Sequence, residues 1–491
     1  MNKHFLELIA FISFVFIGNS QQLAFPGAEG FGAYSKGGRG GQVIEVTSLL
    51  DDLDGSIEGS LRWAFKKNTS EPTTIVFRVS GIINLKAELR GKFTKGLTLA
   101  GQTAPGDGIC IRGNKVNLGG SSNLIIRHLR FRIGLHDDGS FVEGGSLGLE
   151  NANNVIIDHS TFGWSGEENM TMYDNDFTTV QWCIIHEGLY ASGHSKGARS
   201  YGAQWGGQNA TYHHNLLAHN YSRSPRFNGS KHHDKNVKYE YVNNVNYNWG
   251  KANSAYGAYV EITDGTYNCN FINNYYKPGP AHPGSEKSFF AQSSHHSIQG
   301  DSLIARWYMH GNIMEGDANK ALNNDNSLGL DAESYMKVGV SRSQLIAKNA
   351  FQMPHNLIIE SAEDAYKSVL TKAGAFPRDN IDKRIVHEVK TGTASGKGTS
   401  AKYKDKRKDN GYIENPFYGI QKGIIDNPVL AFGSKAYPEY KTYNVPTDTD
   451  HDGMPDAWEN KNGLDPKNAE DRNNTGKDGY TMLELYLNSI K

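Results

Sequence analysis

Short apolar runs, each about the length of a β-strand, recur along a large part of the chain. No apolar period of 3.6 residues lies between most of them, so alternating strand and helix units around an open parallel sheet are not expected. The runs return at roughly 20- to 35-residue intervals, the range in which repeating coils are suspected. The clearest runs are residues 97–100, 123–127, 154–158, 177–181, 239–242 and 304–308.

Four of these segments end on the same residue type. The endings are Asn215, Asn244, Asn274 and Asn312. Asparagine tolerates the left-handed backbone that a sharp corner needs, and equivalent residues of stacked coils can pair their amides as a ladder. Asparagine-rich turns also occur in other β proteins, but four matching strand ends favour a solenoid. The 55 glycines and 11% aromatic residues fit many short strands joined by tight turns. The predicted fold is an all-β, right-handed parallel β-helix.

The pattern changes after about residue 315. Ser361 begins a helix-like segment that ends before Gly374 and Pro377. Its apolar face consists of Ala365, Val369, Leu370 and Ala373. Residues 391–411 are rich in small and charged residues without apolar periodicity, which predicts a mobile surface loop. We therefore assign residues 21–315 to the solenoid, 316–445 to a peripheral wrap with loops and a single helix, and 446–491 to a small C-terminal module.

The first 20 residues resemble a cleaved secretory signal. Lys3 and His4 precede the apolar run of residues 8–17, and small residues follow it. The alternative is an uncleaved anchor, but the run is shorter than the roughly 20 residues that span a bilayer. The predicted location is secreted or periplasmic, with no membrane span after cleavage.

Charge and cysteine content narrow the possible partners. The formal net charge is -1, from 51 basic and 52 acidic residues, so no overall field favours nucleic acid or a membrane surface. An anionic ligand would need a local cationic cluster. Cys110, Cys183 and Cys269 are odd in number and adjoin apolar segments, which predicts buried thiols. We expect a monomer.

The C-terminal module contains a calcium-loop pattern. An EF-hand-like loop takes ligands at positions 1, 3, 5, 7, 9 and 12, with glycine at position 6. Gly453 occupies the sixth position here, and Met454 would offer its carbonyl at the seventh. The predicted side-chain ligands of Ca²⁺ are Asp448, Asp450, Asp452, Asp456 and Glu459. The alternative is an acidic surface turn. A partly similar stretch, residues 471–479, suggests a paired or shared site.

A second cluster consists of cationic and imidazole side chains on successive coils. Stacked coils lie about 5 Å apart, so such residues can share one face and form a basic cleft. Arginine suits carboxylates because its planar fork is bidentate. Taken singly, each of these residues is more commonly a solvated surface group or a structural histidine. The members are His159, His194, Lys196, His213, His214, Arg223 and Arg226.

Several ordered motifs resemble the pectate lyases of polysaccharide lyase family 1, particularly the bacterial branch. They are residues 24–32, 37–41, 59–62, 100–106, 155–159, 181–185, 194–197, 213–215 and 223–226. The resemblance implies a parallel β-helix that cleaves α-1,4-linked galacturonan of plant cell walls by calcium-assisted β-elimination. It implies that Arg223 removes the C5 proton, that Lys196 assists, and that Glu168 is a calcium ligand. It also assigns substrate binding to Arg226, and we place His159, His194 and His213 in the same basic cleft.

One position departs from the family pattern. Gly145 stands where family members with a catalytic calcium place an aspartate. Glu143, Asp137 or Asp138 would have to compensate for the missing carboxylate. This departure leaves a lyase for methylated pectin and a non-catalytic pectin-binding protein open. A glycoside hydrolase on the same architecture is a third alternative and would need two carboxylates across the scissile bond.

Overall fold

The computed structural model describes residues 21–67, 70–136, 138–228, 231, 233–251, 253–259, 265–282, 289–295, 303–316, 319–355, 357–406 and 411–490. The predicted signal segment and Asp137 lie outside these residues. Among the described residues, no helix has the length and apolar character needed to cross a membrane.

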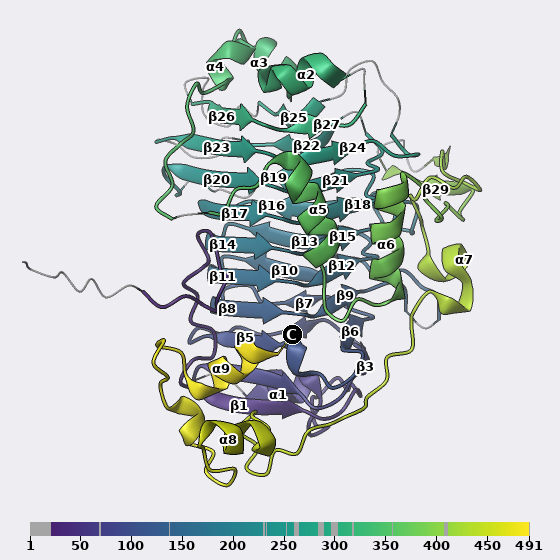
Figure 1. Ribbon diagram of the computed structural model, residues 1–491. Coiled ribbons are helices and arrows are strands. Elements are labelled where there is room, and N and C mark those ends of the chain that lie inside the picture. Colours follow the sequence, from purple (N-terminus) through teal and green to yellow (C-terminus); the bar gives the residue numbers. More distant parts are fainter. Residues whose placement is uncertain are drawn as a thin grey trace, which may run out of the picture.

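Three parallel sheets stack into one solenoid (Figure 1), which confirms the predicted right-handed parallel β-helix. Sheet A has ten strands: β1 (Gln42–Val46), β2 (Thr73–Phe77), β5 (Leu97–Ala100), β8 (Ser122–Arg127), β11 (Asn153–Asp158), β14 (Asp176–Gln181), β17 (Asn209–His213), β20 (Val237–Val242), β23 (Tyr267–Ile272) and β26 (Ala305–His310). Sheet B has nine: β3 (Gly81–Asn84), β6 (Ile109–Arg112), β9 (Arg130–Arg132), β12 (Thr161–Gly163), β15 (Ile184–His186), β18 (Leu216–Ala218), β21 (Val245–Tyr247), β24 (Tyr275–Lys277) and β27 (Ile313–Met314). Sheet C has nine: β4 (Leu89–Arg90), β7 (Val116–Asn117), β10 (Leu147–Glu150), β13 (Glu168–Tyr173), β16 (Tyr201–Trp205), β19 (Arg226–Phe227), β22 (Asn253–Gly257), β25 (Phe289–Ser293) and β28 (Leu330–Asp331).

The apolar runs read from the sequence are strands of sheet A, whose inward side chains form the solenoid core and whose outer face is covered in part by other segments. In β11, Val155 and Ile157 point into the solenoid core, and Ile156 packs outward against Ala24 and Phe25 of the N-terminal segment. Residues 21–41 therefore cover part of the outer face of sheet A. A second segment lies against sheet A farther along the solenoid: Phe351 exchanges two hydrogen bonds with Asn270 of β23.

The asparagine ladder is present. Each ladder asparagine donates its side-chain amide to the Oδ1 of the next one. The distances are 3.0 Å from Asn215 to Asn244, 3.2 Å from Asn244 to Asn274, 2.8 Å from Asn274 to Asn312 and 3.0 Å from Asn312 to Asn326. The left-handed residue, however, is the one before each ladder asparagine, at positions 214, 243, 273 and 311, with φ between 50° and 66°. The ladder residue itself points inward and satisfies backbone groups at the corner.

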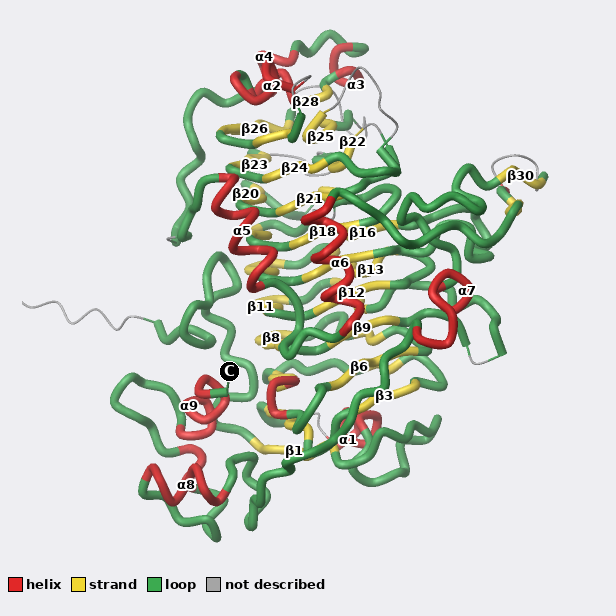
Figure 2. Tube along the Cα trace, turned by 45° about the vertical axis from the view of Figure 1, so that its right-hand side comes forward, coloured by secondary structure: helices red, strands yellow, loops and turns green. Residues whose placement is uncertain are grey.

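The wrap contains more structure than the sequence predicted. Helix α5 (Ala362–Lys372) forms as expected, with Ser361 accepting a hydrogen bond from the Asp364 N–H, and its apolar face packs on sheet B. The prediction of a single helix is wrong, because α6 (Asn380–Thr391) follows with Asp379 as its N-cap. Both helices lie along sheet B in Figures 1 and 2. Within the predicted loop, β29 (Lys402–Lys404) pairs antiparallel with β30 (Tyr412–Glu414), which begins just after it, and the mobility of the loop stays a prediction.

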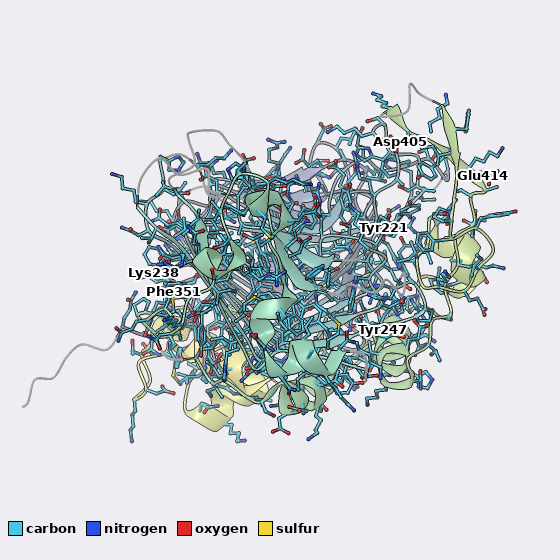
Figure 3. All side chains as sticks on the ribbon, turned by 90° about the horizontal axis from the view of Figure 1, so that it is seen from above. Tyr221, Lys238, Tyr247, Phe351, Asp405 and Glu414 are labelled. Carbon is cyan, nitrogen blue, oxygen red and sulfur yellow. The ribbon has the colours of Figure 1, made fainter. Side chains whose placement is uncertain are left out.

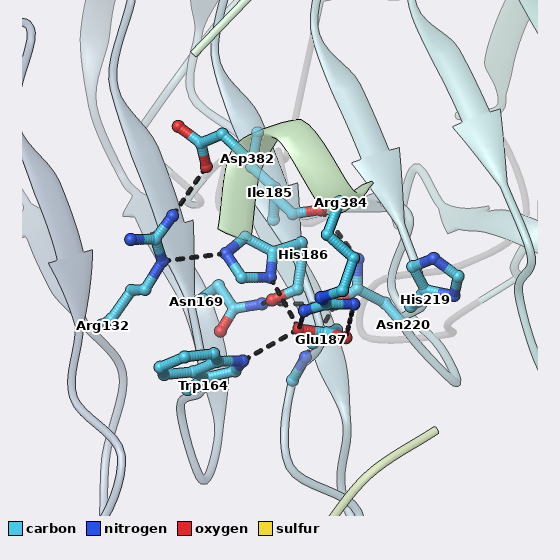
Figure 4. A network of polar contacts seen from close by, with 12 residues as sticks. Arg132, Trp164, Asn169, Ile185, His186, Glu187, His219, Asn220, Asp382 and Arg384 are labelled. Atoms are coloured by element: carbon cyan, nitrogen blue, oxygen red, sulfur yellow. Dashed lines mark hydrogen bonds and ion pairs between the residues drawn. The ribbon is translucent and has the colours of Figure 1, made fainter. Parts of the chain in front are cut away.

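A buried polar network fastens α6 to the solenoid (Figure 4). Arg384 makes two hydrogen bonds of 2.8 Å to Glu187, which also accepts from the Trp164 indole at 2.9 Å. On the same sheet, Arg132 pairs with Asp379 and Asp382 at 2.5 and 2.6 Å. The wrap is thus bound by charge as well as by apolar contact.

The remaining helices are short and lie at the ends and margins of the solenoid. They are α1 (Leu61–Lys67), α2 (Lys320–Asn324), α3 (Glu333–Met336), α4 (Arg342–Leu345), α7 (Pro428–Phe432), α8 (Asp456–Asn462) and α9 (Met482–Ser489). Viewed down the solenoid, Asp405 and Glu414 of the hairpin region lie on the side opposite Lys238 of sheet A (Figure 3). All three cysteines are buried free thiols, as predicted.

Candidate functional site

The candidate site lies at the corner between sheets B and C. Glu168, Tyr201 and Arg226 each begin a strand of sheet C, and Glu168 pairs directly with Tyr201 in the register of β13 and β16. The loop from β15 to β16 carries His194 and Lys196, and the turn from β18 to β19 carries Arg223. Three successive coils therefore bring these residues together, although they are spread over about sixty positions of the sequence.

Arg223 is at the centre of this corner. It has a left-handed backbone, with φ at 58°. Its guanidinium contacts the Glu168 carboxylate, donates to the Tyr256 hydroxyl at 3.2 Å, and stacks over the Tyr201 ring at 4.0 Å. Burial lowers the pKa of Arg223, the positive charge of Arg226 lowers it further, and Tyr256 opposes the shift.

Arg226 retains hydrogen-bonding capacity. Its guanidinium lies 5.4 Å from the centre of the Tyr259 ring, and its buried Nε has no hydrogen-bond partner among the described residues. A buried donor without a partner costs free energy unless a ligand satisfies it. Arg226 is therefore suited to receive an anion at this corner.

His194 is nearby but does not face solvent. Its Nε2 donates to Glu167 at 2.9 Å, and its Nδ1 accepts the Lys196 N–H at 2.9 Å. The hydrogen bond from His194 is the main reason that the pKa of Glu167 is lowered. With both ring nitrogens engaged and the side chain fully buried, His194 shapes the loop that presents the exposed Lys196.

His159, His213 and His214 lie elsewhere, so the prediction that all the cationic and imidazole residues share one face is wrong for these three. His214 follows β17 and stacks on the Trp182 ring at 4.3 Å. His159 is at the corner between sheets A and B, stacked between the rings of His128 and Trp182 at 5.3 and 6.1 Å. His213 ends β17 of sheet A and is completely buried. It lies 3.9 Å from Glu29, because the N-terminal segment covers that face. None of these three positions supports a role in binding substrate beside Arg223.

Sequence reasoning did not identify three residues of this corner. Tyr201 and Tyr256 contact Arg223, and Arg199 donates to the Tyr201 hydroxyl at 3.1 Å. One signal was available: Tyr256 follows Arg223 by 33 residues, which is one coil of the solenoid. Arg199 follows Lys196 within the same loop and adds a further positive charge.

Known proteins with similar sequences align with nearly the whole length of this chain. No protein-family model matches it. A protein described as probable pectate lyase C from Aspergillus flavus is 31% identical over 480 residues, covering 96% of this chain and 94% of the relative. Its namesake from Emericella nidulans is 30% identical over 475 residues, covering 95% and 93%. The chain belongs to the pectate lyase family.

Solved pectate lyase structures are less similar to this chain in sequence than these relatives are. The thermostable pectate lyase PL 47 is 16% identical, with a TM-score of 0.46 over 73% of this chain and 99% of its own. A pectate lyase from Bacillus sp. N165, solved with trigalacturonate, is also 16% identical, with a TM-score of 0.40 over 71% of this chain and 99% of its own. Assignment to the bacterial branch stays a prediction.

The corner of this family member does not fit a resident calcium ion. A Cβ at Gly145 would lie 2.5 Å from the Glu168 carbonyl oxygen, so an aspartate cannot stand there without a backbone shift. Glu168 is paired with Arg223, Glu167 with His194, and Glu143 with the Ser195 hydroxyl. Within the described part of the chain, which omits Asp137, no group of three metal-ligating side chains includes these glutamates.

The C-terminal loop does fit calcium. Asp448, Asp450 and Asp452 place carboxylate oxygens within 4.8 Å of one another, and Asp452, Glu459 and Asp471 do the same. Each of the five has at least one buried oxygen without a hydrogen-bond partner, and Glu459 has two. Burial and mutual repulsion raise the pKa of Asp448 to about 6, of Asp452 to about 7 and of Glu459 to about 8. Hard oxygen donors of this kind suit Ca²⁺.

Asp456 is placed differently from the other predicted ligands of the loop. Its carboxylate accepts hydrogen bonds from the Thr449 N–H at 2.8 Å and the Thr449 hydroxyl at 2.7 Å. It belongs to neither carboxylate group. In this structure Asp456 closes the loop, and its predicted role as a ligand has no direct support.

Proposed function

We propose that this chain is a pectate lyase that cleaves α-1,4-linked polygalacturonate by β-elimination, with Arg223 as the base. The C5 proton passes to a guanidine nitrogen of Arg223, the C5–H electron pair forms the C4–C5 double bond, and the C4–O bond to the leaving chain breaks. The leaving oxygen takes a proton from water or a nearby acid. The products are unsaturated oligogalacturonides.

The observation that carries the proposal is the environment of Arg223. A base must lose its proton, which an arginine in water does not do at ordinary pH. Burial and the neighbouring Arg226 lower the pKa of Arg223, Tyr256 and the contacting Glu168 carboxylate oppose them, and the net shift is downward. The direction of that shift favours the neutral form that elimination requires, and alkaline pH favours it further.

The cations around Arg223 support an acidic polymer as the substrate. Arg226 acts directly on Arg223, and Arg199 contacts Tyr201, which lies against the Arg223 guanidinium. This positive charge can offset the uronate carboxylate and the charge that develops as C5 loses its proton, and we expect the exposed Lys196 to add to it. This arrangement favours free carboxylates over methyl esters. We therefore rank polygalacturonate above methylated pectin.

Arg223→Ala is the decisive variant. We expect a loss of at least about 10³-fold in the formation of unsaturated product from polygalacturonate, measured by ultraviolet absorbance. Arg90→Ala is the control, because Arg90 is exposed on the first strand of sheet C, far along the solenoid. Undiminished activity in Arg223→Ala would overturn the proposal.

Two further outcomes separate the hydrolase and binding-protein alternatives, and a calcium titration tests the metal. New reducing ends without unsaturated product would point to a glycoside hydrolase. Tight retention on a pectate gel with no turnover would point to a pectin-binding protein. Calcium assistance, expected from the resemblance, is tested by titrating calcium into chelated enzyme at a fixed, low concentration of substrate. If the metal acts beside Arg223, chelated enzyme that is still folded should be inactive, and added calcium should restore its activity.

A further inference from the structure

The C-terminal module packs on sheet A at the N-terminal end of the solenoid, over β1 and β2, which we call the first coil, and over the adjoining β5. Met454, Leu483 and Leu487 form an apolar cluster with Val76 of β2 and Ala100 of β5. Helices α8 and α9 lie beside β1 in Figures 1 and 2. A Cβ on Gly453 would meet Val43 of β1 at 3.1 Å, so the turn at the centre of the loop lies directly on the solenoid.

Charged side chains connect the same two surfaces. Arg78, which follows β2, pairs with Glu45 of β1 at 3.2 Å and reaches Asp448 at 4.0 Å. His451, within the loop, contacts Glu45 at 2.7 Å. Arg39 pairs with Glu484 of α9 at 2.7 Å. The loop that gathers the carboxylates is therefore also part of the contact with the first coil.

Asp471 extends the carboxylate group beyond the twelve-residue loop. Its Oδ2 accepts the Asp465 N–H at 2.9 Å, which fixes the side chain, and its Oδ1 is buried without a hydrogen-bond partner. Glu459 is completely buried, and neither of its carboxylate oxygens has a partner. Buried carboxylates that have no protein partner require a cation or protons.

We propose that Ca²⁺ bound by Asp448, Asp450, Asp452, Glu459 and Asp471 locks the C-terminal module onto the outer face of sheet A at the N-terminal end of the solenoid. Asp471 joins a second segment to the loop, so one metal centre fixes both segments against β1 and β2. An ion that binds only the folded state stabilises it by mass action. This calcium requirement is one of fold stability and is independent of the proposed lyase chemistry.

The test compares full-length protein with and without calcium, using chelator-treated samples and calcium chloride alone as the probe. Calcium should raise the thermal unfolding midpoint by at least about 3 °C. Hydrogen exchange should slow in β1 and β2 but not in β26, at the other end of the solenoid. Uniform protection, or none, would overturn the proposal.

Asp471→Asn tests the ligand set. The substitution keeps the shape of the side chain and should lower calcium affinity by roughly tenfold or more, measured by calorimetric titration. Asp478→Asn is the matched control, since Asp478 is exposed and belongs to neither carboxylate group. Wild-type affinity in Asp471→Asn would remove Asp471 from the centre. None of these readouts needs turnover, so failure of the proposed lyase activity would leave them unaffected.

Discussion

At the scale of single residues, Arg223 is subject to opposing influences. Burial and Arg226 favour the neutral base, whereas the Glu168 carboxylate in contact with the guanidinium favours the charged form. The sequence indicated Arg223 and Arg226 because both lie in one short proline-containing turn. It could not indicate that Glu168, two coils earlier, contacts the base. The resemblance had assigned Glu168 to calcium instead.

Glu168→Gln distinguishes these two roles. Removing the carboxylate removes the negative charge that stabilises the Arg223 guanidinium, so the pKa of Arg223 should fall further. Activity rises with pH as the base loses its proton, and the rising limb should therefore move to lower pH by about 1 unit. The measurement is the pH profile of kcat/KM on polygalacturonate.

Glu150→Gln is the control for that shift, because Glu150 is an exposed carboxylate at the end of β10 in the same sheet. Its profile should match the wild type. A loss of activity at every pH that added calcium partly restores would instead identify Glu168 as a metal ligand.

At the scale of elements, the asparagine ladder shows what repetition in a sequence can and cannot predict. Four strand endings predicted the stack, because equivalent corners of a solenoid recur at the same place. The precise corner geometry was not evident, since the left-handed position falls one residue earlier and is taken by histidine, asparagine or glycine. Short strands of sheets B and C, some only two residues long, left no readable period.

Asn244→Ala should destabilise the solenoid by about 3 kcal/mol. The buried side chain accepts the Asn215 N–H at 3.0 Å and donates to the Tyr212 carbonyl at 2.9 Å, so alanine would leave both groups unsatisfied. Asn324→Ala, at an exposed position of α2, should change stability by less than about 0.5 kcal/mol. Chemical denaturation measures both. Equal effects would mean that the ladder contributes little.

At the scale of the whole molecule, the sequence predicted the solenoid and α5 but not how the wrap is held. Helix α6 has its own N-cap and apolar spacing, yet its key contacts join Arg384 to Glu187 and Asp382 to Arg132, about 200 to 250 residues away. Pairings at such separation leave no local pattern. The same limit explains why His213 was placed in the cleft: its burial depends on the N-terminal segment that covers sheet A.

The Arg384–Glu187 pair should be one of the main attachments of the wrap. Burial raises the pKa of Glu187, but Arg384 and His186 more than offset it, so the pKa lies well below its usual value. Arg384→Met would leave that buried carboxylate without its cation, and we expect a loss of about 3–5 kcal/mol in the free energy of unfolding. Because the folded pKa is depressed, this contribution is complete above the unfolded value of 4.5 and disappears only as the pH falls through the folded one.

Lys383→Met on the exposed side of α6 is the control for this loss and should change stability by less than about 0.5 kcal/mol. The double variant Glu187→Gln/Arg384→Met should recover part of the stability, because no buried charge is then left unpaired. Urea denaturation at pH 7 gives the coupling between the two sites. A coupling near zero would mean that apolar packing of α6 on sheet B, rather than this ion pair, holds the wrap in place.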